Sequence, residues 1–171
     1  MSLRHALLGL LIDRPASGYD LMKRFEGSLA NVWPASQSQV YTELTKLAAD
    51  ELITVSDTGP RGRKEYAITD AGQIELRQWL TETKPTRPAR NPVLLRVFFL
   101  GVLDAEQRAD FLTDLAQHAA GDEAALRELR ESIDWDDTDL SRYGRIALEW
   151  GLRFTAMRRE WAEWAATQLP G

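Results

Sequence analysis

The stretch SQSQVYTELTKLAADELI, residues 36–53, predicts a helix with an unusually polar front. Ser36 is followed three positions later by Gln39, which is the spacing of a capping box, in which each side chain satisfies the other residue's backbone donor. We therefore expect the helix to begin at this point. Its apolar positions recur at helical spacing and define an inward face made of Val40, Leu44, Leu47 and Ala48.

The residues before this helix predict two further helices. The first covers about residues 2–13, with Pro15 just beyond its end, and its inward face is Leu3, Leu7, Leu8 and Leu11. The second begins at Ser17, whose hydroxyl can cap exposed backbone N–H groups. Its apolar residues follow a strict four-residue spacing, at Leu21, Phe25 and Leu29.

The residues after it predict a β-hairpin and a fourth helix. Residues 51–56 and 64–69 have the composition of strands, and the segment between them contains turn-forming glycine and proline. Asp70, with Gln73 three residues later, is expected to open a helix that carries Ile74, Leu76, Trp79 and Leu80. Three helices, a hairpin and a fourth helix predict a winged helix-turn-helix, whose third helix enters the DNA major groove.

The polar front of the third helix suits such a groove. Gln, Ser and Thr exchange hydrogen bonds with base edges and phosphates, and Tyr adds an apolar face. Basic residues at the hairpin tip can contact phosphate or the minor groove. A polar helix front or a basic turn alone is usually only solvated, but their joint occurrence in this topology favours DNA. The candidate DNA contacts are Ser36, Gln37, Ser38, Gln39, Tyr41, Thr42 and Lys46 on the helix, and Arg61, Arg63 and Lys64 on the hairpin.

The net charge of −5 does not by itself favour nucleic acid. Its distribution is uneven, however, because residues 1–90 hold 12 basic against 11 acidic side chains and residues 91–171 hold 9 against 15. The sequence has no cysteine, which excludes a disulfide frame and a thiolate metal site and fits cytoplasmic residence. The apolar run at residues 93–103 is well short of the roughly 20 residues that span a bilayer, so we expect no association with membranes.

Prolines in the segment TKPTRPARNP, residues 83–92, prevent a continuous helix and indicate a linker. We expect residues 1–82 to form the DNA-binding domain and residues 93–171 an all-helical C-terminal dimerisation domain. The fold class is therefore mainly α. From Asp104, a plausible cap, apolar residues recur at spacings of three and four, which predicts one long helix or two halves broken near Gly121.

The last helix of the sequence carries a large aromatic stripe. A contiguous apolar face of this size marks an interaction surface, so the stripe either folds back on the preceding helix or meets a second chain. We predict a homodimer interface made of Tyr143, Trp150, Phe154, Met157, Trp161 and Trp164. Two DNA-binding domains joined in this way would bind the two halves of a palindromic operator in double-stranded DNA. Trp150 and Phe154 are also candidates for an effector pocket, with core packing as the alternative.

No motif in the sequence indicates catalysis. His5 and His118 lie in unrelated segments, and His5 stands beside apolar positions, where a packed or a surface histidine is a simpler interpretation than a metal ligand. The acidic run at residues 134–139 lacks the glycine and the distal glutamate of a calcium loop and indicates a solvated turn. There is no phosphate-binding glycine loop and no elbow serine. We therefore expect no enzymatic activity, no bound metal and no cofactor.

Four segments carry a resemblance to a known family. They are LRHALLGLLIDRPASGYDLMKRFE, SQSQVYTELTKLAADELI, GPRGRKEYAITDAGQIELRQWL and NPVLLRVFFLG. Residues 3–80 resemble the PadR family of bacterial transcriptional regulators, most specifically at residues 17–21 and 66–72, and the fourth segment resembles the branch with a virulence-activator-like C-terminal domain. One departure is Thr42, where many relatives have proline. The resemblance implies DNA contacts from the third helix and the hairpin. It also implies a homodimer, mostly repressing, that can be released by a small aromatic or hydrophobic compound.

Two hypotheses follow from the sequence. The first is a dimeric, sequence-specific transcriptional regulator, most simply a repressor that a small molecule relieves. The second is a protein-interaction module whose winged helix never contacts DNA. Binding to the promoter upstream of the protein's own coding region, with an affinity that falls as salt rises, separates the two.

Overall fold

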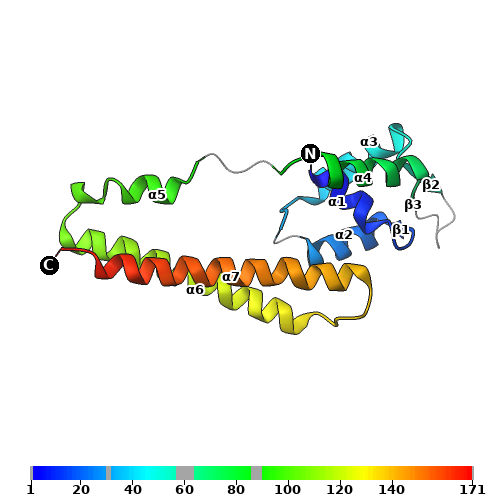
Figure 1. Cartoon of the computed structure of the whole chain (residues 1–171). Coiled ribbons are helices and arrows are strands. Elements are labelled where there is room, and N and C mark those ends of the chain that lie inside the picture. Colours follow the sequence, from blue (N-terminus) through cyan, green and yellow to red (C-terminus); the bar gives the residue numbers. More distant parts are fainter. Residues whose placement is uncertain (1, 30–31, 57–63, 86–89, 171) are drawn as a thin grey trace. The chain divides into compact units, whose positions relative to one another are not determined.

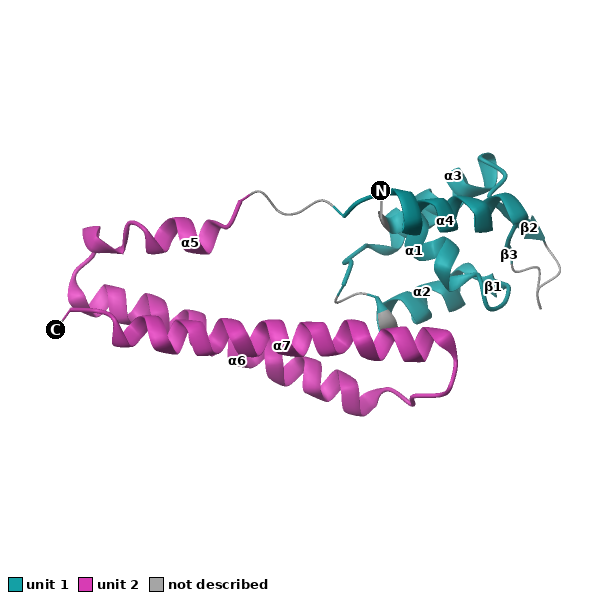
Figure 2. Ribbon diagram, viewed as in Figure 1, with its two compact units in different colours: residues 1–86 teal, residues 87–171 magenta. Residues whose placement is uncertain are grey.

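The computed structural model describes residues 2–29, 32–56, 64–85 and 90–170 (Figure 1). The chain forms two compact units, residues 1–86 and residues 87–171, which Figure 2 shows in different colours. Each unit has its own secondary structure and is described separately below. Within the described ranges, no helix combines the length and the apolar character needed to cross a membrane.

The first unit is a winged helix-turn-helix, as the sequence predicts. Its elements are α1 (Ser2–Leu10), β1 (Ala16–Ser17), α2 (Gly18–Ser28), α3 (Gln37–Ala49), β2 (Ile53–Ser56), β3 (Glu65–Ile68) and α4 (Asp70–Glu82). The three strands form an antiparallel sheet in the order β1-β3-β2. Tyr66 of β3 lies at its centre, because it pairs with Ala16 on one side and with Val55 on the other.

The core of this unit is the one that helical spacing predicts. Leu7, Leu8 and Leu11 from the first helical segment are buried, together with Leu21, Phe25, Val40, Leu44 and Leu47. Leu3, Leu29 and Ala48 are partly buried and pack against this cluster. The apolar periodicity of the first three helices therefore identifies the inward faces of α1, α2 and α3.

Three details of the first unit differ from the prediction. The helix α1 ends at Leu10 rather than near residue 13, and a tighter turn follows, with the Leu11 N–H donating to the Leu8 carbonyl at 3.1 Å. The strand β1 was not predicted, since two residues carry no periodicity. The cap of α4 is Thr69 rather than Asp70, because the Thr69 hydroxyl accepts from the Gly72 N–H at 3.1 Å. In α4, whose buried side the sequence did not indicate, Ile74 and Leu80 are exposed.

The turn after α3 fixes where the sheet begins. The Leu52 N–H donates to the Leu47 carbonyl at 2.9 Å and the Glu51 N–H to the Ala48 carbonyl at 3.1 Å, which together make a Schellman motif. This motif requires a left-handed residue, and Glu51 has φ of 59°. Thr69 connects the turn to α4, because its hydroxyl also donates to the Glu51 carbonyl at 2.9 Å.

The second unit is a long helical hairpin preceded by two short helices. Its elements are α5 (Pro92–Val97), the 3₁₀ helix η2 (Leu100–Val102), α6 (Ala105–Ser132) and α7 (Asp139–Thr167). Asp104 caps α6, and with Gln107 it forms a capping box. The helix α6 is continuous through Gly121, so of the two predicted alternatives the single long helix is correct.

The two long helices, α6 and α7, lie side by side along most of their length (Figure 1). Their contact face holds Leu112 and Ala119 from α6 and Leu152 and Ala162 from α7, all of them buried. Glu123 is buried in the same seam and pairs with Arg127 and with Arg159, whose Nε lies 3.2 Å from its carboxylate. The hydrogen bond that Arg159 donates to Glu123 is also the main cause that raises the pKa of Arg159.

Candidate nucleic-acid interface

The outer face of α3 carries the residues that were predicted to contact DNA. Gln37, Ser38, Gln39, Tyr41, Thr42 and Lys46 are all exposed, and so is the cap residue Ser36. Ser38, Thr42 and Lys46 follow one another at four-residue spacing, opposite the buried row Val40, Leu44 and Leu47. These three side chains therefore form a single outward row on the third helix. Thr45 lies on the same exposed face and was not predicted.

Two of the residues predicted to contact DNA, Ser36 and Gln39, also cap the first turn of α3. The Ser36 N–H donates to Oε1 of Gln39 at 2.8 Å, and the Gln39 N–H donates to Oγ of Ser36 at 3.3 Å. The capping box predicted from the sequence is therefore present. Because the carbonyl end of the Gln39 side chain is used in this way, its amide nitrogen is the part that can donate to another molecule.

Tyr41 links α3 to both α2 and the sheet. A Cβ built on Gly18, the first residue of α2, would lie 2.6 Å from Cε1 of Tyr41, so the tyrosine ring rests directly against this glycine. On the sheet side, burial raises the pKa of Tyr66, and the neighbouring Tyr41 raises it further. With 38% of its surface exposed, Tyr41 positions α3 against its neighbours and still has an edge at the surface.

A hollow of about 710 Å³ lies beside the outward row of α3. Ser38, Thr42 and Lys46 form one side of it, and Arg4, Trp33 and Pro34 are among the residues that line the remainder. Arg4 forms an ion pair with Asp50, and Nζ of Lys46 lies 3.7 Å from Glu43. The basic side chains at this hollow are thus held in place by carboxylates of α3 and its cap.

The wing, which is the loop between β2 and β3, lies largely outside the described residues. This applies to Arg61 and Arg63, so their predicted contacts remain predictions. Lys64 is described and exposed, immediately before β3 begins at Glu65. Because β3 pairs with both β1 and β2, the base of the wing is fixed to the three-stranded sheet.

The aromatic stripe on α7, made of Tyr143, Trp150, Phe154, Met157, Trp161 and Trp164, faces away from α6 for most of its length. Trp150 is 67% exposed and stacks on Phe154 with 5.0 Å between the ring centroids. Tyr143, Met157 and Trp164 are exposed as well, and Trp161 is half-buried. The stripe therefore does not fold back on the preceding helix, which was one of the two alternatives. Pairing of the stripe with a partner chain stays a prediction.

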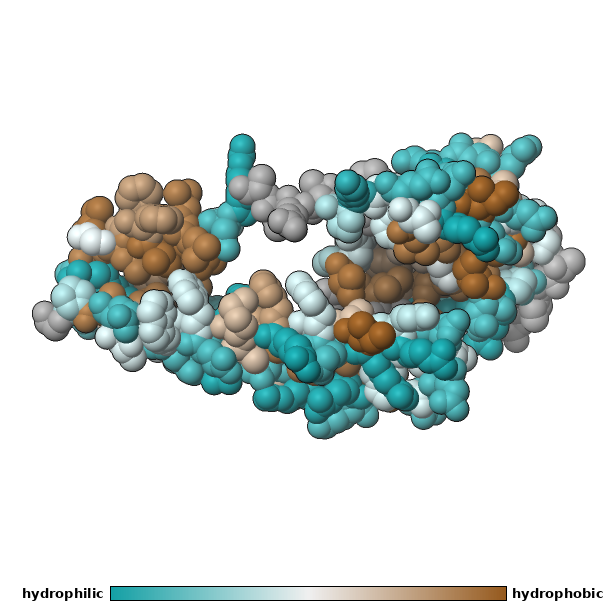
Figure 3. Space-filling view, viewed as in Figure 1, coloured by the Kyte–Doolittle hydropathy of each residue, from teal (hydrophilic) through white to brown (hydrophobic). Residues whose placement is uncertain are grey.

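Sequence reasoning missed a second apolar surface, on α5 and η2. Leu95, Phe98, Phe99 and Val102 are between 61% and 85% exposed. Figure 3 shows this apolar surface over α5 as a continuous brown area. The signal was present in the sequence, because VLLRVFFLGVL contains a single charge in eleven residues, but the run is too short to show which helical face is buried.

The histidines do not suggest a metal site. His5 is buried and stacks on Trp79, with 4.5 Å between ring centroids, and its Nε2 lies 3.3 Å from Glu75. Of the two interpretations of His5, packed or at the surface, the packed one is therefore correct. His118 bonds the carbonyl of Asp114, one turn earlier, at 2.6 Å. Among the residues that the structure describes, no group of three or more histidine or carboxylate side chains is placed to hold a metal ion.

Comparison with known proteins identifies the family. Residues 7–78 match the PadR-like family of transcriptional regulators, and residues 89–170 match the family described as virulence activator alpha C-terminal. The negative transcriptional regulator PadR of Bacillus subtilis is 33% identical over 136 residues, which cover 77% of this chain and 73% of that protein. The chain belongs to the PadR-like family of transcriptional regulators.

Solved structures of PadR-like proteins agree with both units. The crystal structure of Bacillus subtilis PadR in complex with operator DNA has a TM-score of 0.84 and 27% sequence identity, and the match covers 98% of each chain. The crystal structure of the same regulator with p-coumaric acid has a TM-score of 0.81, also at 27% identity, and the match covers 96% of this chain and 93% of that one. The family predicted from four sequence segments is therefore confirmed, and this is a family of regulators rather than of enzymes.

Proposed function

We propose that this chain is a homodimeric repressor that binds operator DNA through α3 and the wing and releases it when a small aromatic compound binds. The observation that carries the proposal is the outward row Ser38, Thr42 and Lys46 on the third helix of a winged helix-turn-helix. A relative with the same fold has been solved in complex with operator DNA. In this row the short polar side chains of Ser38 and Thr42 are suited to contact base edges, and the neighbouring Lys46 is suited to contact a phosphate.

The aromatic stripe supports the dimer. An exposed aromatic surface of this kind is costly in water, and a second copy of the same chain would cover it. Two DNA-binding domains joined through their C-terminal units would bind successive major-groove faces, roughly 34 to 36 Å apart on B-form DNA. The relative solved with p-coumaric acid supports a small aromatic effector. A protein that acts on chromosomal operators works in the cytoplasm, and the cysteine-free sequence fits that location.

A gel-shift titration on the promoter upstream of the protein's own coding region tests this function. We expect specific binding whose logarithmic affinity falls linearly with the logarithm of the salt concentration. Lys46→Gln and Lys64→Gln remove phosphate contacts, so each should weaken binding to all sequences alike and lower the salt slope by about 1. Arg77→Gln is the matched control, because Arg77 is an exposed basic residue of α4, outside α3 and the wing.

Substitutions of the short polar residues test base reading. Ser38→Ala and Thr42→Ala are expected to change which operator positions tolerate mismatches, at about 1 to 3 kcal/mol per affected base pair. The alternative function, a winged helix that binds only another protein, predicts no salt-dependent DNA binding and no change of sequence preference in these variants. Absence of salt-dependent DNA binding by the wild-type protein would favour that alternative.

A further inference from the structure

Glu43 is a charged residue of α3 that is largely withdrawn from solvent and lacks a hydrogen bond. Its side chain is 19% exposed. Its ion-pair partner is Lys46, whose Nζ lies 3.7 Å from Oε2 of Glu43, which is beyond hydrogen-bond distance. In the part of the chain that the structure describes, no donor bonds the Glu43 carboxylate. This is unfavourable, because a carboxylate removed from water normally needs donors to offset its desolvation.

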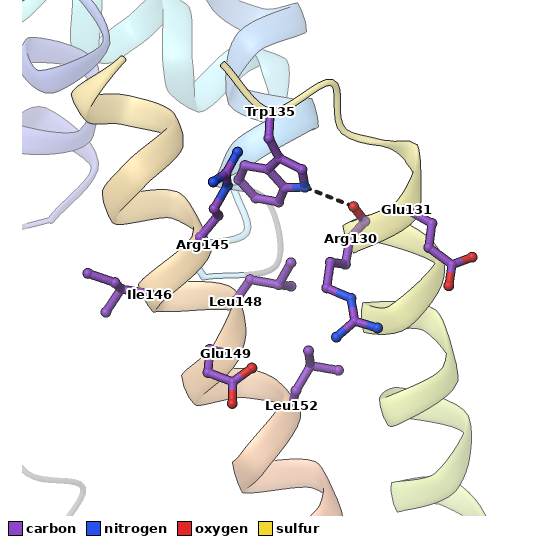
Figure 4. A pocket seen from close by; sticks show the side chains of 8 residues that line it. All are labelled: Arg130, Glu131, Trp135, Arg145, Ile146, Leu148, Glu149 and Leu152. Carbon is purple, nitrogen blue, oxygen red and sulfur yellow. Dashed lines mark hydrogen bonds between the residues drawn. The ribbon is translucent and has the colours of Figure 1, made fainter. Parts of the chain in front are cut away.

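Other charged groups of the molecule are either bonded or open to water. Glu123 is more deeply buried than Glu43, and it accepts hydrogen bonds from Arg127 and Arg159. In the cavity of about 570 Å³ that Trp135 borders, where α6 ends and α7 begins, the charged lining residues are all exposed (Figure 4). They are Arg130, Glu131, Arg145 and Glu149. Glu43 thus breaks a rule that these groups obey, and such exceptions are expected at functional sites.

Glu43 lies beside the residues that were predicted to contact DNA. It follows Gln39 by four positions, so the two side chains form a second row on α3. This row is adjacent to the outward row Ser38, Thr42 and Lys46, and both rows line the hollow beside α3. Four residues of helix rise about 6 Å, or roughly two base-pair steps of B-form DNA. Gln39 and Glu43 can therefore face different base pairs of one groove.

The carboxylate of Glu43 restricts what the residue can contact in that groove. An ionised carboxylate accepts hydrogen bonds and donates none, so it is repelled by phosphates and cannot bond O6 or N7 of guanine or O4 of thymine. The donors in the major groove are the N6 amino group of adenine and the N4 amino group of cytosine. Adenine presents the acceptor N7 beside its donor, whereas cytosine presents the donor alone. Cytosine is therefore the base that the carboxylate selects.

The ion pair with Lys46 does not prevent this contact. The Lys46 side chain is 63% exposed, and pairs at three-residue spacing on a helix surface contribute little to stability. Lys46 can therefore turn to a phosphate while Glu43 faces the bases. Gln39 complements Glu43, because its Oε1 is held in the capping box and its amide nitrogen is left as a donor. The second row thus offers one donor and one acceptor to the groove.

We infer that Glu43 is a specificity-determining residue, which accepts a hydrogen bond from the N4 amino group of a cytosine in each half of the operator. The inference rests on the proposed function, because it requires that α3 enters the major groove. It adds a means of rejecting wrong sequences, since a binding register that places the carboxylate against a phosphate or a base acceptor is penalised by repulsion.

Selection of sites from a random double-stranded DNA library by the full-length protein tests the inference. We expect the wild-type protein to select a cytosine at one fixed position of each half-site, and any other base there should lower affinity about tenfold or more. Glu43→Gln should move the preference at that position from cytosine to adenine, because glutamine pairs with N6 and N7 of adenine. Glu43→Ala should lose the cytosine preference and gain no other. Glu82→Gln is the matched control, because Glu82 is an exposed carboxylate at the end of α4.

A change in the DNA tests the contact on the wild-type protein itself. The selected cytosine is replaced by 2-pyrimidinone, which lacks the N4 amino group, and affinity is measured by fluorescence anisotropy. Wild type and Glu82→Gln should both lose about tenfold in affinity, whereas Glu43→Ala should lose much less, since it has no acceptor to leave unpaired.

Three results would overturn the inference. They are an unchanged base preference in Glu43→Gln, an effect of that substitution on all sequences alike, and wild-type binding that does not respond to 2-pyrimidinone. The failure of the proposed function would look different, because the wild-type protein would then select no sequence at all. Specific selection by wild type with the same preference in Glu43→Gln would contradict the role of Glu43 alone.

Discussion

At the scale of single residues, Gly72 allows α4 to approach the end of α3. A Cβ built on Gly72 would lie 2.2 Å from the Leu52 carbonyl oxygen and 2.8 Å from Cγ1 of Ile68. The first of these atoms belongs to the backbone of the Schellman turn, which cannot move without breaking the hydrogen bonds that close α3. No side chain larger than hydrogen fits at this position.

Gly72→Ala is therefore expected to destabilise the first unit by about 3 kcal/mol or more, at the upper end of the range for overpacking. Hydrogen exchange followed by mass spectrometry on peptides from α3 and α4 measures the local loss of protection. Gly27→Ala is the control, because a Cβ on Gly27 of α2 meets nothing within 4 Å. Equal protection in the two variants would show that the contact with Leu52 is not restrictive.

Gly18 has a comparable role for the recognition helix. A methyl group there would push against the ring of Tyr41, which in turn lies beside Tyr66 of the sheet. Gly18→Ala is expected to shift α3 and to lower operator affinity about tenfold, or on the order of 1.4 kcal/mol. Fluorescence anisotropy with labelled operator DNA measures the effect, again beside Gly27→Ala. An unchanged affinity would mean that Tyr41 does not position the helix.

The residues that the sequence identifies well are those whose interactions are local. The capping box of Ser36 and Gln39 spans four positions, so its spacing alone predicts both hydrogen bonds. Gly18 and Gly72 are different, because the atoms that would collide with a side chain there belong to Tyr41 and Leu52, some 20 residues away in the sequence. Their role depends on tertiary contacts that no spacing rule contains.

At the scale of secondary structure elements, the buried charge of Glu123 fixes how α6 and α7 pair. Its carboxylate binds Arg127 on its own helix and Arg159 on the other, and Arg158 reaches Asp122 at 3.0 Å beside it. A slip of one helix along the other would separate Glu123 from Arg159 and leave the buried carboxylate with Arg127 of its own helix alone, which is unfavourable. The pair Glu123 and Arg159 thus defines one register of the hairpin.

Glu123→Gln is expected to lower the free energy of unfolding by about 1 to 3 kcal/mol, since hydrogen bonds to two charged groups are weakened. Urea denaturation followed by circular dichroism measures the change. Glu149→Gln is the matched control, because its ion pair with Arg153 is exposed and such pairs contribute at most about 1 kcal/mol. If both variants lose the same stability, burial of Glu123 has no special effect.

The turn between α6 and α7 should respond to acid. Hydrogen bonds from Ser141 and Thr138 lower the pKa of Asp136 to about 2, from a usual value of 3.8. A carboxylate whose pKa is lower in the folded state stabilises the fold fully above pH 3.8, and this contribution is lost as the pH falls toward 2. We expect NMR titration of the Asp136 carboxyl carbon to give a pKa of about 2 in wild type and a higher pKa in Thr138→Val, which stays below 3.8 because the hydrogen bond from Ser141 remains.

Elements with a regular apolar spacing or with clear turn residues at their ends were predicted, and elements without such a pattern were not. The helices α2, α3, α6 and α7 have apolar spacing over many residues, and the hairpin β2–β3 is bounded by turn residues. The strand β1 is only Ala16–Ser17, and its partner is Tyr66, far along the chain. The sequence did not indicate the buried side of α4, and in the structure α4 packs on α1 through the stack of Trp79 on His5 while Ile74 and Leu80 are exposed. The apolar content of α4 alone does not reveal which side is buried.

At the scale of the whole molecule, the account depends on the pairing of two chains through the aromatic stripe. A charged residue in the middle of the stripe should prevent this pairing, since an unpaired charge would be desolvated in the interface. Trp150→Glu is expected to convert dimers into monomers in sedimentation velocity experiments and to weaken operator binding. Gln117→Glu, on the exposed surface of α6, is the control and should remain dimeric. A Trp150→Glu protein that is still dimeric would exclude the stripe as the main interface.

The sequence predicted the architecture of the molecule better than its details. Two units, a winged helix and a helical C-terminal part, follow from the proline-rich segment and from the change in charge between the halves. The cavity between Trp135 and Arg130 could not be predicted, because it arises where two long helices diverge around a loop. Such a space is set by the angle and register of the helices rather than by any residue pattern.

Sedimentation velocity of the wild-type protein on fluorescently labelled promoter DNA tests the central claim most directly, because it reports binding and stoichiometry together. The account predicts two chains on each specific duplex, at salt concentrations where a scrambled duplex of equal length is not bound. One chain per duplex, or equal binding to both duplexes, would contradict it.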